Sequence, residues 1–137
     1  QCGKAYIREY RNLETAEIRI CDFITNMEAA YCAADIIVSR SGGTISELAI
    51  IGKPTILLPS PNVAEDHQTK NVQALVDKQA TILVKDIEAK DKLVSSMIQL
   101  LGDEAAQRNL SAHIAQFAKP NAAEEIAQKI IEKINKN

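Results

Sequence analysis

The feature that most constrains this sequence is a regular alternation, between residues 18 and 84, of short β-rich runs with longer helical segments. The runs 35–39 and 54–59 are mostly apolar, which is typical of strands covered on both faces. We expect strands at 18–24, 35–39, 54–59 and 81–84, with helices at 27–34, 44–51 and 66–78 between them. Strands and helices that alternate through short loops predict an α/β fold, a Rossmann-like parallel sheet with flanking helices on both faces.

Beyond about residue 88 the pattern is only helical. Asn121 is placed to cap the last helix, and Glu124 three residues on would complete a capping box. The same helix carries an apolar stripe made of Ala123, Ile126, Ala127, Ile130 and Ile134. The stripe could pack onto a domain outside this chain or close the core of this one, and we expect the second.

Length and composition fit a single domain. The chain has 137 residues, of which 46% are hydrophobic and 25% charged, so it holds ample aliphatic material for a core. Its net charge of -2 argues against a nucleic-acid partner, because a duplex binder needs a basic face. The start, Gln1-Cys2-Gly3-Lys4, looks like the end of a buried strand. We expect residues 1–137 to be one domain cut from a longer protein.

The cysteines and histidines show no metal-binding pattern. The three cysteines, at positions 2, 21 and 32, are odd in number and form no CxxC pair. The two histidines, at 67 and 113, lie far from them in the sequence. We therefore expect reduced thiols, no metal site and no cofactor.

The first candidate site is segment 39–47, which follows a strand and opens a helix. Ligands in open parallel sheets bind beyond the carboxyl ends of the strands, so such a loop is the place to look. Its glycines, Gly42 and Gly43, let backbone approach a ligand closely, and the amides at a helix start suit phosphate oxygens. Thr44 and Ser46 add hydroxyl donors. The segment predicts a phosphate-binding turn, although it is neither GxGxxG nor a Walker motif.

Two residues of this segment have a second interpretation. Glu47 could accept hydrogen bonds from both hydroxyls of a ribose. Thr44 and Glu47 also match a capping box, in which Glu47 would bind only the Thr44 amide, and the residues alone do not separate the two. Arg40 could be a phosphate partner or a solvated loop residue, and we expect the second.

The second candidate is segment 59–71, which also leaves a strand and enters a helix. Two prolines restrict the shape of its loop. His67, Gln68 and Asn71 could converge on one side of the first helical turn, and amide side chains offer both donors and acceptors to sugar hydroxyls. The alternative, which composition alone favours, is that Asp66 is an N-cap and the rest is surface.

Phe23 and Ile24 form the third candidate, at the end of the expected strand 18–24. An aromatic and an aliphatic side chain at a strand end can sandwich a flat base, while backbone N–H and C=O groups read its edge. The alternative is that both residues simply pack against the next helix, as most such strand ends do.

Taken together, these segments resemble the C-terminal domain of the MurG family. That family comprises bacterial GT-B glycosyltransferases that add N-acetylglucosamine from UDP-GlcNAc to a lipid-linked muramyl-pentapeptide. The resemblance covers residues 1–85 in spacing, its last motif looks like the Bacteroidetes form, and the helical tail is compatible. The motifs are Phe23-Ile24-x-x-Met27, Ala33-Ala34-Asp35-x-x-x-Ser39-Arg40-Ser41-Gly42, Ser46-Glu47-Leu48 with Gly52-Lys53-Pro54, and Asp66-His67-Gln68-x-x-Asn71.

The resemblance implies the C-terminal half of a GT-B fold and a role for each matched residue. Ile24 would meet uracil through its backbone, with Phe23 beside it. Glu47 would hold the ribose hydroxyls, and Gln68 would contact the N-acetylglucosamine, with His67 adjacent as no more than a catalytic assistant. The implied substrate-binding residues are Phe23, Ile24, Ser41, Gly42, Gly43, Thr44, Ile45, Ser46, Glu47, His67, Gln68 and Asn71.

One departure from the family affects the phosphate-binding turn. The loop from Arg40 to Ser46 is one residue shorter than is common in the family. The register of Gly43, Thr44 and Ile45 on the diphosphate therefore stays open.

The resemblance also implies partners and a location. The donor would be UDP-GlcNAc, and the lipid-linked acceptor would be held by an N-terminal domain outside this chain, which would also carry the general base. The complete enzyme would act in peptidoglycan synthesis, cell shape and division, in the cytoplasm and peripheral on the inner face of the cell membrane, and this fragment alone would be inactive. The alternatives are another UDP-sugar GT-B transferase, a UDP-GlcNAc epimerase-like protein or a non-catalytic α/β binding module.

Overall fold

The chain divides into two compact units, Gln1–Ala34 and Asp35–Asn137. The computed structural model describes residues 1–60 and 67–135, with side chains from residue 72 onward in the helix that begins at His67.

The first unit contains little regular structure. It consists of α1 (Ile7–Tyr10), the 3₁₀ turn η1 (Arg11–Leu13) and α2 (Met27–Ala33). Helix α2 begins where the sequence predicts it, because Asn26 is its N-cap and the side-chain oxygen of Asn26 accepts a 3.0 Å hydrogen bond from the amide of Ala29.

The expected strand at 18–24 is wrong, since no strand is assigned there. Two backbone hydrogen bonds join this segment to the start of the chain, from Cys2 N to Cys21 O (2.9 Å) and from Gly3 N to Asp22 O (3.1 Å). An extended run becomes a strand only when a neighbour pairs with it along a ladder. Alternating polarity at 18–24 therefore describes an extended segment here, and not a sheet strand.

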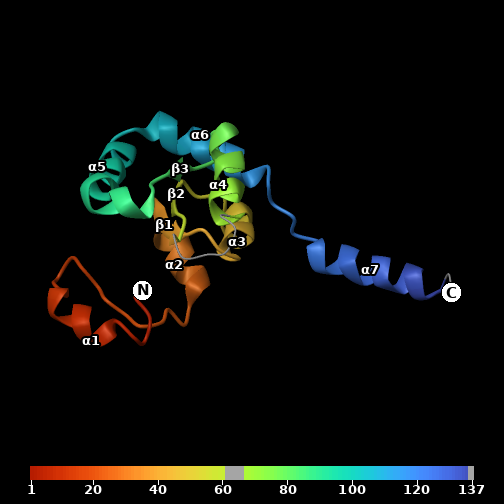
Figure 1. Ribbon diagram of the computed structural model, residues 1–137, viewed down its shortest axis with the longest axis horizontal. Helices are drawn as coiled ribbons and strands as arrows, with labels where there is room; N and C mark the ends of the chain where they lie inside the picture. The colour runs from red at the N-terminus through yellow and green to blue at the C-terminus, as the bar shows by residue number, and fades with distance from the viewer. Residues whose placement is uncertain (61–66, 136–137) are drawn as a thin grey trace. The chain divides into compact units, whose positions relative to one another are not determined.

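The second unit contains a parallel sheet in the order β1-β2-β3. Its strands are β1 (Ile37–Arg40), β2 (Thr55–Leu58) and β3 (Ile82–Leu83). Arg40 pairs with Leu58, and Leu57 pairs with Leu83. Because all three strands run the same way, their carboxyl ends lie along one edge of the sheet (Figure 1).

Helices connect and cover the strands. Figure 1 shows α5 on one side of the strands and α3 and α4 on the other, so the expectation of an α/β sheet flanked on both faces is confirmed. The helices are α3 (Thr44–Ile51), α4 (His67–Asp77), α5 (Ala89–Leu101), preceded by the 3₁₀ turn η3 (Asp86–Glu88), α6 (Glu104–Ala115) and α7 (Ala122–Ile134).

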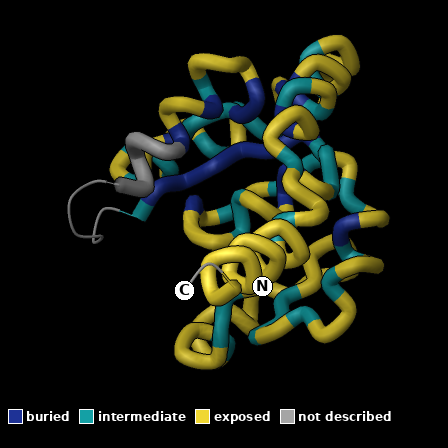
Figure 2. Tube along the Cα trace, turned by 90° about the vertical axis from the view of Figure 1, so that its right-hand side faces the viewer, coloured by how far each residue is buried: buried dark blue, intermediate teal, exposed yellow. Residues whose placement is uncertain are grey.

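The core is centred on β2, all four residues of which are buried. Figure 2 shows this strand as a continuous buried stretch. Ile56 and Leu58 project to one face of the sheet, where they form a cluster with Val84, Leu100 and Leu110. A strand buried on both faces reads as an unbroken apolar run, which is why segment 54–59 is so easily recognised in the sequence.

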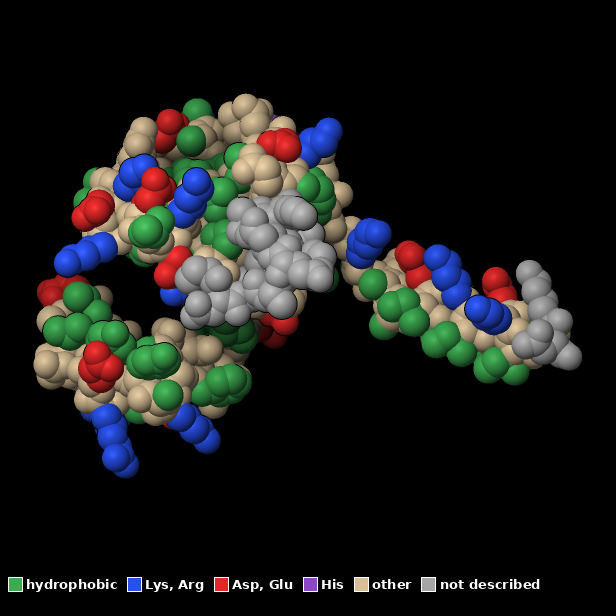
Figure 3. All heavy atoms as spheres, in the orientation of Figure 1, with side chains coloured by type: hydrophobic (Ala, Val, Ile, Leu, Met, Phe, Trp, Pro, Cys, Tyr) green, Lys and Arg blue, Asp and Glu red, His purple; other side chains and the backbone are tan. Residues whose placement is uncertain are grey.

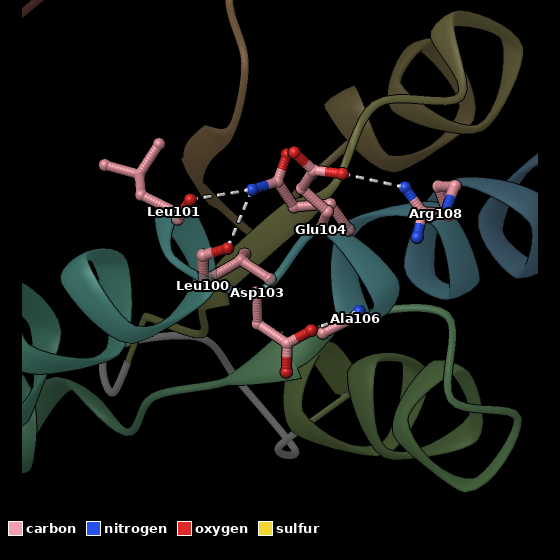
Figure 4. Close-up of polar contacts among 7 residues, drawn as sticks. Leu100, Leu101, Asp103, Glu104, Ala106 and Arg108 are labelled. Atoms are coloured by element: carbon pink, nitrogen blue, oxygen red, sulfur yellow. Dashed lines mark hydrogen bonds and ion pairs between the residues drawn. The ribbon is translucent and has the colours of Figure 1, made fainter.

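The turn between α5 and α6 is fixed by side-chain caps (Figure 4). The side-chain amide of Gln107 donates to the carbonyl oxygens of Leu100 (2.9 Å) and Leu101 (3.1 Å) at the end of α5. Asp103 caps the start of α6 by accepting a 2.9 Å hydrogen bond from the amide of Ala106. These bonds satisfy backbone groups that a helix end leaves unpaired.

Helix α7 differs from expectation in two respects. Asn121 stands at its N-cap but makes no side-chain capping hydrogen bond, so the predicted capping box is not formed. No residue of α7 is buried, and Figure 3 shows its hydrophobic side chains along one side of the helix. Ile126, Ile130 and Ile134 are more than half exposed, so the expectation that this stripe closes the domain's own core is wrong.

Among the residues that the structure describes, no helix has the length and apolar character needed to cross a membrane.

Candidate functional site

The carboxyl edge of the sheet carries the first candidate site. The short turn of residues 41–43 leaves β1 at this edge and enters α3 directly. Its position follows from the topology, because β1 and β2 run parallel and Ser41 N still donates to Leu58 O at 3.4 Å, just beyond the last ladder pair. The turn is therefore anchored to the central strand at the place where ligands bind in such sheets.

Ser41 is the unusual residue of this turn. Its side chain is 1% exposed, and its hydroxyl oxygen has no hydrogen-bond partner among the described residues. A buried polar group without a partner costs free energy, and each such group in a folded protein calls for a reason. Because this oxygen has less than 1 Å² of accessible surface, a ligand oxygen at the start of α3 would become its partner only after the Ser41 side chain turned toward it.

The start of α3 is open and electrostatically suited to an anion. Gly43 is its N-cap, and a Cβ built on Gly43 would meet no atom of the described residues within 4 Å. The first amides of a helix lack helical partners and stand at the positive end of the helix dipole. Ile45 N is the exception in this turn, because it donates to Gly42 O at 3.3 Å.

Glu47 lies in the first turn of α3 and is exposed. Thr44 is already a helical residue, with Gly43 before it in αR geometry, and so Thr44 is not the N-cap that the capping-box interpretation requires. This removes the structural premise of that interpretation. Thr44 and Ile45 are half-buried, while Gly42, Gly43 and Ser46 are exposed.

Arg40 is not simply solvated, contrary to expectation. Its guanidinium Nη1 forms an ion pair with Oδ1 of Asp86, the first residue of η3. The Arg40 side chain is 62% exposed and that of Asp86 is 33% exposed. Sequence reasoning missed Asp86, although an acidic residue shortly after a strand at the carboxyl edge is a usable signal.

The third candidate lies in the first unit, where Phe23 and Ile24 help to line an open cavity of about 430 Å³. Phe23 is 64% exposed, which fits a side chain available for stacking better than one packed against a helix. The cavity is lined by Gln1, Arg19, Cys21, Phe23, Ile24, Thr25, Asn26 and Ala30.

Two backbone amides that border this cavity already donate hydrogen bonds to side chains of the protein. The amide of Ile24 donates to the side-chain oxygen of Gln1 at 2.9 Å, and the amide of Phe23 donates to Oδ1 of Asp22 at 2.8 Å. A base that used the Ile24 amide would have to take the place of the Gln1 side chain.

The second candidate falls largely outside the described residues. The backbone of His67, Gln68 and Asn71 lies in α4, as the sequence predicts, but their side chains and Asp66 are outside the description. Helix α4 follows β2, whose carboxyl end lies at the same edge as the 41–43 turn.

The described residues contain no group of three His, Cys, Asp or Glu side chains placed to hold a metal ion.

Comparison with known proteins gives consistent matches along the chain. Residues 1–130 match the family described as the glycosyltransferase family 28 C-terminal domain. The chain is 50% identical to proteins of Cytophaga hutchinsonii and Flavobacterium psychrophilum, over 98% and 96% of its own length. Both are named UDP-N-acetylglucosamine--N-acetylmuramyl-(pentapeptide) pyrophosphoryl-undecaprenol N-acetylglucosamine transferase. The chain spans 37% and 36% of the lengths of these curated relatives.

A solved structure is similar as well. The crystal structure of Acinetobacter baumannii MurG superposes with a TM-score of 0.84 at 26% sequence identity. The match covers 96% of this chain and 40% of that one.

Proposed function

The chain belongs to the glycosyltransferase family 28 C-terminal domain family, and from this membership we propose that it is the donor-binding part of a longer N-acetylglucosaminyltransferase. The complete enzyme would transfer N-acetylglucosamine from UDP-GlcNAc to a lipid-linked muramyl-pentapeptide during peptidoglycan synthesis. The names of the relatives that are 50% identical to this chain support this reaction.

Family membership carries the proposal, and the structural observation that supports a donor site at this turn is the buried hydroxyl of Ser41, which is without a partner among the described residues and lies next to the start of α3. We assign the diphosphate of UDP-GlcNAc to this turn, where helix amides and hydroxyls face the edge of the sheet. The ribose belongs on Glu47, in the first turn of the same helix. The remaining implied contacts are Gly42, Gly43, Thr44, Ile45 and Ser46.

The base and the sugar are assigned to the other two segments. Phe23 and Ile24, which line the 430 Å³ cavity, would take the uracil. Gln68 would contact the N-acetylglucosamine, with His67 and Asn71 on the same helix. A Gln68→Ala variant should therefore lose discrimination between UDP-GlcNAc and UDP, whereas equal losses for both ligands would contradict this assignment.

The reaction proposed is an attack by an acceptor hydroxyl on C1 of the sugar, with inversion at C1 and departure of UDP. The developing charge on the diphosphate would be stabilised by the amides at the start of α3 and by nearby hydroxyls. The acceptor and the general base would be supplied by a domain that this chain does not contain.

The exposed surface of helix α7 supports the proposal that this chain is part of a longer enzyme. Its exposed stripe of isoleucines has no buried member, although apolar faces of helices are normally covered. We take this stripe to pack on the acceptor-binding domain of the complete enzyme, which would work in the cytoplasm, peripheral on the inner membrane face.

The deciding experiment is a calorimetric titration of the full-length protein with UDP and with UDP-GlcNAc, followed by transfer assays with a muramyl-pentapeptide lipid and with a diacylglycerol acceptor. We expect saturable binding of both nucleotides and transfer to the muramyl lipid alone. Transfer to diacylglycerol would indicate another UDP-sugar transferase, and the absence of nucleotide binding would indicate a non-catalytic module.

A further inference from the structure

We propose that Asp86 is a positioning residue of the donor site, which holds the guanidinium of Arg40 at the carboxyl edge of the sheet for contact with the diphosphate. This inference rests on the proposed function and extends it to a residue outside the matched motifs. The observation behind it is the ion pair between Arg40 and Asp86.

The pair spans the whole described sheet. Arg40 ends β1, Asp86 follows β3, and β2 lies between these strands. Neighbouring strands are about 4.8 Å apart, so β1 and β3 are separated by roughly 10 Å, and only a long side chain can cross that gap. The ion pair therefore draws the Arg40 side chain over the end of β2 and along the edge where the diphosphate is assigned.

The backbone of Arg40 also borders the proposed phosphate turn. Its carbonyl oxygen accepts a 3.2 Å hydrogen bond from the amide of Gly42 and a 3.0 Å bond from the hydroxyl of Ser39. The next residue, Ser41, carries the buried hydroxyl that lacks a partner among the described residues. The backbone of Arg40 thus takes part in the turn, while its guanidinium lies at the carboxyl edge of the sheet.

The geometry of a guanidinium explains why holding it would matter. The group has five N–H donors, and the ion pair with Asp86 uses a donor on Nη1, which leaves other donors of this 62% exposed side chain to meet an anion. A free arginine samples many rotamers, and ordering it on binding costs entropy. A carboxylate that orders it beforehand removes part of that cost.

Stability is a poor alternative explanation for this pair. Ion pairs between exposed side chains contribute little to folding. The chain offers a matched comparison in Glu104 and Arg108 on α6, whose ion pair of 3.1 Å is also exposed. Both residues belong to the first turns of α6, as Figure 4 shows, and neither belongs to the proposed donor site.

The test is a double-mutant cycle on the full-length protein, read by calorimetric titration with UDP. We expect Asp86→Asn to weaken UDP binding roughly fivefold, the scale of one well-placed charge interaction, with no change in melting temperature. Arg40→Ala should weaken it as well, and the double variant should bind no more weakly than Arg40→Ala alone, because Asp86 acts only through Arg40. Asp86→Glu should recover part of the loss.

Controls separate the possible outcomes. Glu104→Gln removes the matched pair on α6 and should leave UDP binding unchanged. Unchanged or tighter binding by Asp86→Asn, or losses that add in the double variant, would overturn the positioning role while leaving the proposed function standing. Failure of the unsubstituted protein to bind UDP would overturn the proposed function and this inference with it.

Discussion

At the scale of single residues, the candidate site is marked by a conflict between burial and hydrogen bonding. Ser41 buries a hydroxyl that has no partner among the described residues, where an alanine would leave nothing unsatisfied. A residue that is suboptimal for folding is expected where binding requires it. Stability and ligand affinity should therefore respond in opposite directions when this hydroxyl is removed.

Ser41→Ala should leave the melting temperature unchanged or raise it, because the substitution removes an unsatisfied buried group. The same variant should weaken UDP binding by about tenfold, the equivalent of one hydrogen bond to a charged group. Thermal unfolding and calorimetric titration of the full-length protein measure the two effects. A variant that unfolds at lower temperature and binds UDP normally would show that the hydroxyl serves the fold.

Glu47→Ala tests the ribose contact. Glu47 is exposed and lies on the first turn of α3, so its loss should not unfold the domain, although it removes a favourable charge near the helix N-terminus. We expect UDP binding to weaken by about tenfold. Glu47→Gln keeps one acceptor oxygen, so its affinity for UDP should lie between those of Glu47→Ala and the unsubstituted protein. Unchanged affinity of Glu47→Ala for UDP would refute the ribose assignment.

At the scale of elements, the site depends on how α3 ends as much as on how it starts. The helix stops at Gly52, whose φ of 67° is in the left-handed region that favours glycine. The amide of Gly52 donates to the carbonyl oxygen of Leu48 at 2.9 Å, which closes the last turn. The chain then enters β2 at Thr55, three residues later, and so the length of α3 is set at this glycine.

Gly52→Ala should destabilise the second unit by about 1 kcal/mol, the usual cost of left-handed backbone for a residue with a Cβ. The cost is conformational, because the one described atom that the added Cβ would meet is Ala115 Cβ, at an ordinary 3.7 Å. Gly52→Asn should lose less, since asparagine tolerates this conformation. Chemical denaturation of the three proteins measures the difference, and equal stability for Gly52→Ala and the unsubstituted chain would contradict the argument.

Elements with strong local signals can be predicted from the sequence, whereas those that depend on distant partners cannot. Helix α3 has both a glycine-rich start and a glycine stop, and its expected bounds, 44–51, agree with the structure. Segment 18–24 has a strand-like pattern but makes only two backbone bonds to the start of the chain. Asn121 is a residue type that favours the N-cap, and it stands at the N-cap of α7, but its side chain makes no capping hydrogen bond.

The candidate site likewise has parts that the sequence predicts and parts that it does not. The turn at 41–43 could be predicted because a helix start after a buried strand has a local signature. The ion pair between Arg40 and Asp86 joins residues 46 positions apart, and no periodicity links them. The side chains of His67, Gln68 and Asn71 lie outside the described residues, so their roles remain predictions from the resemblance.

At the scale of the whole molecule, the resemblance to the MurG family is confirmed by the matching family model and by relatives that are 50% identical. The expected fold, the C-terminal half of a GT-B glycosyltransferase, is confirmed by the superposition on Acinetobacter baumannii MurG. The chain spans little more than a third of the relatives' length, 37% in the case of the Cytophaga hutchinsonii protein. Under the proposed function, features that are unexplained within the chain are therefore candidates for contacts with another part of a longer protein.

The apolar stripe of α7 is the clearest of these features, and it yields a prediction that compares two lengths of protein. Ile126 and Ile130 are 59% and 54% exposed, so replacing both by serine should leave the melting temperature of the 137-residue chain unchanged. If the stripe packs on the acceptor-binding domain, the same double variant should destabilise the full-length enzyme by about 3 kcal/mol, the scale of two half-exposed isoleucines becoming buried.

Lys129→Ser with Glu132→Ser, on the same helix but outside the isoleucine stripe, is the matched control and should be silent at both lengths. Differential scanning calorimetry on the unsubstituted protein and the two double variants, three proteins at each length, measures the contrast. Destabilisation of the 137-residue chain by the isoleucine variant would mean that α7 closes this domain's own core after all. Indifference at both lengths would mean that the stripe packs on neither domain, since burial of these side chains is the only source of the expected loss.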